Sequence, residues 1–119
     1  MKLEQLQGRF TIIGRNQDEH RSSYKGVLEL NVISDHRVEA KWLINNEQEQ
    51  FGTGFFKDHI LVINFNYKSE YNYVFKGVVV YKCLSENLLQ GFWSEKHGDA
   101  NYLGEETCYK IISDKSILN

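Results

Sequence analysis

Proline is absent from this chain, and cysteine and long apolar runs are scarce. The 119 residues include two cysteines and carry a net charge of −2. Proline interrupts a ladder of paired strands, so its absence is compatible with β-structure throughout. The slightly negative charge excludes a general binder of nucleic acid or of anionic membranes, because both need a basic surface. No apolar run approaches the length of a transmembrane helix, so a membrane protein of that kind is also excluded.

The two cysteines, Cys83 and Cys108, lie in strand-like segments that are not consecutive. Their alternation phases place Cys83 on the inward face and Cys108 on the outward face, so a disulfide between them is not expected. Two free thiols are typical of a reducing compartment. Residues 1–7 have no apolar core like that of a signal peptide. Together these features predict a cytoplasmic protein.

Aromatic residues are abundant, at 13% of the chain, and strands favour them. Short segments of alternating apolar and polar residues are separated by polar turns, which is typical of an all-β sandwich or barrel. The segment containing Leu28 and Leu30 shows the alternation clearly. The predicted strands cover residues 8–14, 24–33, 38–44, 48–56, 60–67, 73–84, 88–93 and 104–111. Residues 1–7 are expected to form a short helical turn that plugs one end, and residues 112–119 a frayed tail.

The order and spacing of the strands predict one all-β domain, an antiparallel up-and-down meander of about eight strands closed into a small barrel. Closure removes two edges that could otherwise pair with other chains, and a two-sheet sandwich is the alternative. In a meander, alternate connections lie at the same end of the sheet. Residues 34–37, 57–59 and 85–87 are tight turns, whereas residues 15–23 and 94–103 are long loops. We therefore expect one closed end and one open mouth with binding residues near the long loops.

The alternation also predicts which side chains point into the barrel. The inward set is Phe10, Ile12, Leu28, Leu30, Ala40, Trp42, Leu61, Ile63, Phe65, Val79, Tyr81, Leu89, Trp93, Tyr109 and Ile111. A cavity lined by apolar and aromatic groups is typical of a small-molecule site, although the same residues could instead fill the core.

Several glycines share the inward face of their strands, namely Gly26, Gly77 and Gly91. A missing side chain at such a position either sharpens a bend or leaves space beside a ligand. The face taken by Gly52 and Gly54 is not determined by the pattern. If they point inward, Phe51 and Phe55 are exposed, and an exposed aromatic pair would indicate contact with a second copy or a protein partner.

The opening residues 6–10, Leu-Gln-Gly-Arg-Phe, resemble the Gly-x-Trp start of lipocalins and avidins, with Phe10 where tryptophan is usual. Tyr24-x-Gly26, Gly52-x-Gly54, residues 77–81 and residues 91–93 are also similar to small bacterial β-barrel proteins with no assigned activity. The resemblance covers residues 6–111 and is to calycin-type barrels. It implies a fold and a tendency to bind something inside, and it transfers no catalytic residue.

The predicted ligand-binding residues are Trp42, Phe65, Tyr81, Trp93, Tyr109 and Glu105. Glu105 shares its phase with Tyr109, so it points inward near the mouth if the last strand includes it, and a partly buried carboxylate there would have a raised pKa. If the strand starts one residue later, Glu105 is solvated. Glu106 presents the same alternatives in the opposite phase.

No metal or cofactor site is predicted. His20, His97 and Asp99 lie at the same expected end, but their spacing matches no metal signature. Phosphate-binding glycine loops, Cys-x-x-Cys and the Gly-x-Ser-x-Gly elbow are absent from the sequence, and neither cysteine has a histidine partner.

Three functions remain open at this point. The first is binding of a small apolar or aromatic ligand between the long loops. The second is a protein-interaction or immunity-type module with a filled barrel, whose acidic mouth loops would attract a partner of opposite charge. The third is an isomerase or cyclase that uses the cavity, with Glu105 or Tyr81 as the proton carrier.

Overall fold

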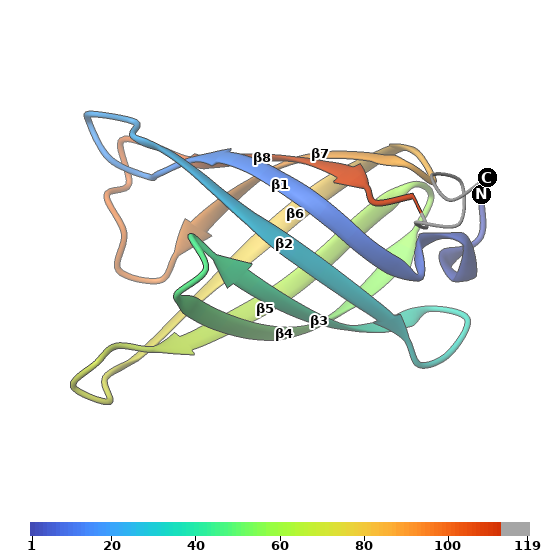
Figure 1. The fold of residues 1–119 in the computed structure, drawn as a ribbon, viewed down its shortest axis with the longest axis horizontal. Helices are drawn as coiled ribbons and strands as arrows, with labels where there is room; N and C mark the ends of the chain where they lie inside the picture. The colour runs from blue at the N-terminus through green and yellow to red at the C-terminus, as the bar shows by residue number, and fades with distance from the viewer. Residues whose placement is uncertain (113–119) are drawn as a thin grey trace.

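The computed structural model describes residues 1–112, and it is an eight-stranded antiparallel barrel (Figure 1). The strands are β1 (Gly8–Arg15), β2 (Ser23–Val32), β3 (Arg37–Ile44), β4 (Gln48–Lys57), β5 (Ile60–Lys68), β6 (Val74–Ser85), β7 (Leu88–Glu95) and β8 (Gly104–Lys110). Each strand pairs with the next along the chain, and β1 also pairs with β8, which closes the sheet. The predicted meander and barrel are confirmed, and the sandwich alternative is wrong. The predicted tail lies outside the described residues, except for Ile112.

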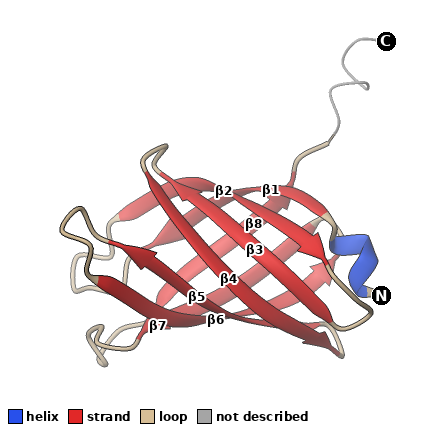
Figure 2. Ribbon diagram, turned by 90° about the horizontal axis from the view of Figure 1, so that it is seen from below, coloured by secondary structure: helices blue, strands red, loops and turns tan. Residues whose placement is uncertain are grey.

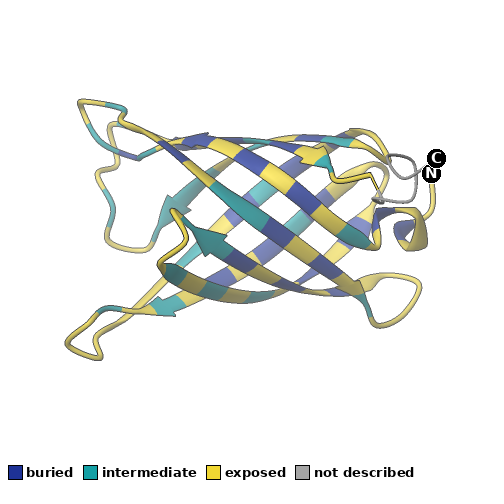
Figure 3. Cartoon of the chain, in the orientation of Figure 1, coloured by how far each residue is buried: buried dark blue, intermediate teal, exposed yellow. Residues whose placement is uncertain are grey.

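Burial alternates along the strands because successive side chains point to opposite faces of the sheet (Figure 3). In β1, Phe10 and Ile12 are buried while Thr11 and Ile13 face outward. Closure converts the inward face into one core, which is continuous around the barrel. The predicted inward residues from Phe10 to Leu89 are all buried, and Trp93 packs against the core.

The last strand has the opposite phase from the one predicted. Tyr109 and Ile111 are exposed, at 48% and 40% of their surface, whereas Cys108 is fully buried. The phase is set by register, because Cys108 lies directly between two inward residues, Ile12 of β1 and Leu89 of β7. The predicted inward orientation of Tyr109 and Ile111, and the outward orientation of Cys108, are therefore wrong.

The two cysteines are both buried and both free. Cys83 pairs with Leu89, and Leu89 pairs with Cys108, so the cysteines lie two strands apart. Two strand spacings amount to about 10 Å, which is beyond the reach of a disulfide. The expected absence of a disulfide follows from this separation and not from opposite faces.

The two ends of the barrel differ as predicted. The long loops 16–22 and 96–103 lie at one end, together with the connections after β3 and β5, and this end is the mouth (Figure 1, left). The tight connections lie at the other end, where the 3₁₀ turn η1 (Leu3–Leu6) covers the barrel (Figure 2). Leu3 and Leu6 are buried there, which confirms the predicted plug. Lys110 Nζ donates to the carbonyl of Gln5 over 2.9 Å and holds the turn against β8.

The outer surface carries Phe51 and Phe55, which the sequence analysis expected to be exposed if Gly52 and Gly54 point inward. Gly52 and Gly54 point inward, and Phe51 and Phe55 are each 47% exposed on the outer face of β4. The ammonium group of Lys41 lies 5.9 Å from the centre of the Phe51 ring. Contact of this pair with a second copy or a protein partner stays a prediction. Within the described part of the chain, no helix has the length and apolar character needed to cross a membrane.

Candidate functional site

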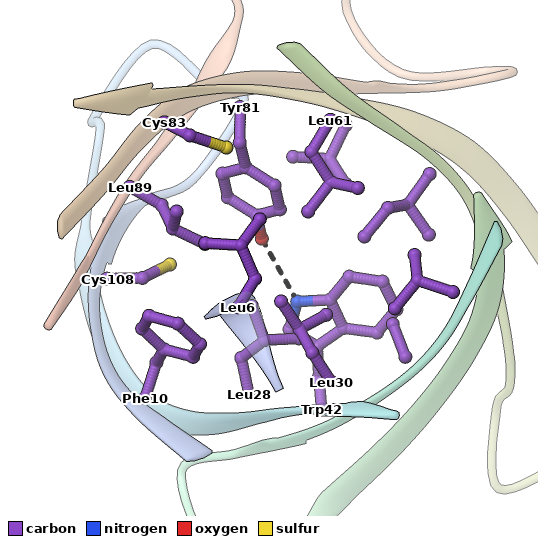
Figure 4. Packing of buried hydrophobic residues seen from close by; sticks show 14 of the residues in the cluster. Leu6, Phe10, Leu28, Leu30, Trp42, Leu61, Tyr81, Cys83, Leu89 and Cys108 are labelled. Atoms are coloured by element: carbon purple, nitrogen blue, oxygen red, sulfur yellow. Dashed lines mark hydrogen bonds between the residues drawn. The ribbon is translucent and has the colours of Figure 1, made fainter. Parts of the chain in front are cut away.

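The barrel interior is filled in its closed half and hollow in its mouth half. In the closed half, Leu6, Phe10, Leu30, Leu61 and Leu89 pack together without exposed surface (Figure 4). Toward the mouth lies a cavity of about 100 Å³. Its lining residues are Asn16, Tyr24, Trp42, Ile44, Gln48, Gln50, Phe65, Tyr67, Val79, Trp93, Glu95 and Glu106.

The floor of the cavity is a buried carboxylate, Glu106 of β8, held by two tyrosines. The hydroxyl of Tyr24 donates to Glu106 Oε2, and the hydroxyl of Tyr81 donates to Oε1, each over 2.6 Å. Each tyrosine is in turn the acceptor for an indole. Trp93 Nε1 donates to Tyr24 over 2.9 Å, and Trp42 Nε1 donates to Tyr81 over 3.2 Å (Figure 4). The five side chains come from β2, β3, β6, β7 and β8, so only the closed barrel brings them together.

Burial controls the ionisation of this network. It raises the pKa of Glu106 above the ordinary carboxyl value, and the hydrogen bonds from Tyr24 and Tyr81 oppose that rise without cancelling it. Burial, followed by the charge of Glu106, also raises the pKa of both tyrosines well above the ordinary value. Both hydroxyls therefore remain protonated and act as donors to the Glu106 carboxylate.

Aromatic rings form the walls above this floor. Phe65 meets Trp42 edge to face, with ring centres 6.1 Å apart and planes at 66°, and it meets Trp93 at 6.2 Å and 86°. Phe65 is thus steeply inclined to both indoles, and we call the space lined by Trp42, Phe65 and Trp93 the aromatic box. Toward the rim, Tyr67 lies parallel to Phe65, at an interplanar angle of 9°, and stacks on Phe75 at 5.2 Å.

Glycines opposite these rings let them lie close to the barrel wall. Tyr24 is paired directly with Gly14 and Phe65 with Gly77, and a Cβ added at either glycine would overlap the ring. The sequence analysis offered a bend or space beside a ligand for the inward glycines; at Gly77 the space is taken by the Phe65 ring, so it is not left free for a ligand. The rings of Tyr24 and Phe65 thus lie against the glycines of the barrel wall and line the cavity.

The rim of the cavity is polar and acidic. The hydroxyl of Tyr67 donates to Glu95 Oε2 over 2.6 Å, and burial together with this bond raises the pKa of Tyr67. The amides of Asn16, Gln48 and Gln50 complete the polar part of the lining. No lysine, arginine or histidine is among the lining residues. A ligand that enters therefore meets acceptor oxygens and amides at the rim and a carboxylate at the floor.

The two long mouth loops are joined mainly by the side chain of Gln17, and Arg21 adds a hydrogen bond from its Nη1 to the carbonyl of Leu103 over 3.0 Å. Gln17 Nε2 donates to Ser94 Oγ and to the carbonyls of Asp99 and Tyr102, over 2.9 to 3.1 Å. Its Oε1 accepts from the backbone N–H of Glu95 over 3.0 Å. The side chain is buried, so the loops beside the cavity are fixed to one another by a shared amide.

The predicted ligand-binding residues divide into two groups. Trp42, Phe65 and Trp93 line the cavity, and Tyr81 lies beneath it in the network with Glu106. Tyr109 and Glu105 point away from the interior, because β8 has the opposite phase. The side chain of Glu105 is 60% exposed and pairs with Arg21 at 3.1 Å, so the alternative in which Glu105 is solvated is the correct one.

The sequence analysis missed the central residue of the site. Glu106 was left with the same alternatives as Glu105 in the opposite phase and was not among the predicted ligand-binding residues. Gly104 and Cys108 share its phase, and both residue types are common in interiors. That pattern was an available signal, but the phase was assigned from the large apolar residues Tyr109 and Ile111 instead. Tyr24, Tyr67 and Glu95 were also missed, because they lie at strand ends where alternation weakens.

Neither thiol is an activated nucleophile. Burial raises the pKa of Cys83 to about 11, and burial followed by the charge of Glu106 raises that of Cys108 well above its ordinary value. Among residues 1–112, no three side chains of the histidine, cysteine, aspartate and glutamate types come together in a way that could hold a metal ion.

Comparison with known proteins gives similarity of fold alone. No protein-family model matches the chain, and no curated protein sequence matches it. Among solved structures it is similar to the redesigned beta barrel mFAP1 bound to DFHBI, with a TM-score of 0.72, 18% identity, and coverage of 90% of this chain and 96% of that one. It is also similar to the redesigned beta barrel mFAP0 bound to DFHBI, with a TM-score of 0.70, 18% identity, and coverage of 89% and 99%. The chain thus has the fold of small eight-stranded barrels that include ligand-binding designs.

Proposed function

We propose that this protein binds a small organic molecule in the mouth cavity. The observation that carries the proposal is the combination of a hollow mouth half, aromatic walls and one buried carboxylate at the floor. Small-molecule sites typically combine an apolar lining with a few convergent polar groups. The barrels mFAP0 and mFAP1 support the proposal, since scaffolds of similar fold hold DFHBI.

The size of the cavity limits the ligand. Pockets for drug-sized molecules span about 300–1,000 Å³, whereas this cavity measures about 100 Å³. An apolar cavity of about 150 Å³ takes up benzene. The ligand, or the part of it that enters the barrel, therefore has few non-hydrogen atoms, and a larger molecule would extend between the loops.

Binding can be tested through the two indoles. Trp42 and Trp93 both line the cavity, and both indole N–H groups belong to the network. We expect a ligand to shift their indole N–H resonances and to change tryptophan fluorescence. The ligand set would be small aromatic and polar organic molecules, with DFHBI included.

A blocking variant makes the test specific. Ile44 lines the cavity near the mouth, so Ile44→Trp should abolish the shifts. Ile13→Trp is the matched control, because Ile13 is exposed on the outer face of β1 and should leave binding unchanged. Spectra that stay unchanged across the whole set, or binding that survives Ile44→Trp, would refute a ligand site in the mouth.

A second candidate function is proton transfer within the cavity, as in an isomerase or cyclase. It is favoured by one observation, the raised pKa of Glu106 in a position that faces the cavity. Glu106 replaces Glu105, which with Tyr81 was one of the two proton carriers expected from the sequence. If a turnover is found, Glu106→Gln should abolish it while Glu105→Gln retains it. Equal activity of both variants would remove this candidate.

A further inference from the structure

The cavity contains acidic groups and no basic ones. Glu106 at the floor and Glu95 at the rim carry its only ionisable carboxyl groups, and the other polar lining groups are amides and tyrosine hydroxyls. Among the described residues, Arg21 forms a salt bridge with Glu105, the neighbour of Glu106 on β8. The Glu105 side chain lies on the outer face of that strand. Within residues 1–112, no lysine, arginine or histidine lies within 4.0 Å of the Glu106 carboxylate. A buried carboxylate without a cationic partner is energetically costly.

The hydrogen bonds of the floor all run in one direction, toward Glu106. Trp93 donates to Tyr24 and Trp42 to Tyr81, which leaves the two hydroxyl protons for the carboxylate. In this arrangement Glu106 serves only as an acceptor, which is the role of the ionised form. Each carboxylate oxygen accepts one tyrosine proton, and a carboxylate oxygen has capacity for a further donor. Glu106 also lines the cavity, so a ligand there can contact this carboxylate.

The walls suit a positive charge as well. Trp42, Phe65 and Trp93 are set at steep angles around the same space, and Tyr24 and Tyr67 extend the aromatic lining. A cation near aromatic faces is stabilised by the ring quadrupole, and the gain is larger in a desolvated site. Aromatic cages with a carboxylate recognise alkylammonium groups by this combination of forces.

We propose that the cavity ligand is a small organic ammonium cation, whose N–H groups or charge meet Glu106 while its alkyl groups fill the aromatic box. This inference rests on the proposed ligand-binding function and narrows its chemical class. A body of about five non-hydrogen atoms suits a cavity somewhat smaller than one that holds benzene. An anion of the same size would face Glu106 and Glu95 without any basic side chain to pair with.

The test uses three probes that share one tert-butyl body and differ in their head group: tert-butylammonium, tert-butanol and pivalate. Binding to the unmodified protein is followed by the indole N–H resonances of Trp42 and Trp93, at mildly alkaline pH. We expect tert-butylammonium to bind about tenfold or more tightly than tert-butanol, and pivalate not to bind, as desolvated charge pairing and cation–π attraction predict.

Matched variants identify the groups responsible. Glu106→Gln should weaken tert-butylammonium binding about tenfold or more, since the loss of a buried charge partner costs over 1.4 kcal/mol. Glu105→Gln, one residue away on the outer face, should leave it unchanged. Glu95→Gln provides a second test at the rim that leaves the buried network intact, and a several-fold loss is expected there.

The outcomes separate this inference from the proposed function. If tert-butanol or a neutral aromatic probe binds as tightly as the cation, the cavity binds ligands but the ammonium class is wrong. If pivalate binds best, the charge argument is overturned in the same way. If none of the three probes binds and the wider ligand set also leaves both indoles unchanged, the ligand-binding function itself fails.

Discussion

Trp93 lies across Gly104, its directly paired neighbour on β8, so closely that a Cβ at position 104 would overlap the indole ring. This contact aims Trp93 Nε1 at the hydroxyl of Tyr24 and so begins one arm of the hydrogen-bond network that ends on Glu106. The absence of one side chain on β8 thus positions a donor on β7.

Gly104→Ala should therefore destabilise the protein and break the hydrogen bond from Trp93 Nε1 to the hydroxyl of Tyr24. Overpacking of this kind costs about 1–3 kcal/mol, and the displaced indole loses its hydrogen bond to Tyr24. Urea denaturation measures the loss, and the Trp93 indole N–H resonance should move. Glu105→Ala is the control, because an exposed ion pair contributes about 0–1 kcal/mol. A Gly104→Ala protein as stable as the control would show that Trp93 has room to shift.

Tyr81→Phe should raise the pKa of Glu106 further and destabilise the fold. The change removes a donor from Glu106 Oε1 and leaves Trp42 Nε1 without its acceptor, and an unsatisfied buried donor costs about 1–3 kcal/mol. The carboxyl carbon of Glu106, followed by NMR against pH, reports the pKa. Tyr109→Phe removes a hydroxyl from the outer face and should leave that titration unchanged. Equal titration curves for the two variants would contradict the network.

The strand pattern predicted the fold well because, in a closed barrel, one face of each strand is buried and the other meets solvent, so apolar and polar residues alternate. Leu28 and Leu30 alternate with polar residues, so the face of β2 could be assigned from sequence. Strand β8 could not, since glutamates occupy both of its phases, and Tyr109 and Ile111 favour one phase while Cys108 favours the other. The phase there is determined by register with β1 and β7, which is a property of the closed sheet.

The site was less predictable than the fold for a related reason. A carboxylate inside a barrel is tolerated only where donors surround it, and the donors of Glu106 are Tyr24 and Tyr81, which lie 82 and 25 residues away in sequence. No local pattern contains that information. Trp42, Phe65 and Trp93 were predicted correctly as inward from the alternation within their own strands.

Stability should fall with rising pH across a window that begins near the ordinary carboxyl pKa. Because the pKa of Glu106 is raised in the folded state, folded protein retains this proton after the unfolded chain has lost it. Stability from this group is full below the unfolded pKa and is lost as pH rises through the folded pKa. The slope approaches about −1.4 kcal/mol per pH unit within the window. Glu106→Gln should remove that slope, and an identical pH profile for the variant would contradict it.

Gln17→Ala should loosen the mouth without unfolding the barrel. The amide of Gln17 is bonded to Ser94, Glu95 and two carbonyls of the 96–103 loop, so its removal leaves those groups to water. We expect faster amide hydrogen exchange in loops 16–22 and 96–103 and unchanged exchange in the closed half of the barrel. Glu19→Ala, in the same loop but exposed, is the control. Uniform exchange changes along the whole chain would indicate global destabilisation instead.

Leu6→Ala should destabilise the closed end strongly. Leu6 is fully buried beneath the strands, and truncation of a buried leucine costs about 2–5 kcal/mol. Leu84→Ala removes the same atoms from a half-exposed position on β6 and should cost far less. Thermal denaturation of both variants gives the comparison. Similar losses for the two would mean that η1 is not part of the cooperative core.

The pairing of β1 with β8 makes the final strand the one that completes the sheet. Until residues 104–110 are in place, β1 and β7 each present a row of unpaired backbone groups to which other chains can add a strand. A newly synthesised chain therefore carries two open edges until residues 104–110 have left the ribosome, and the closing contact is slow because it joins distant segments. Truncation before β8 would thus produce an aggregating chain rather than a seven-stranded version of this protein.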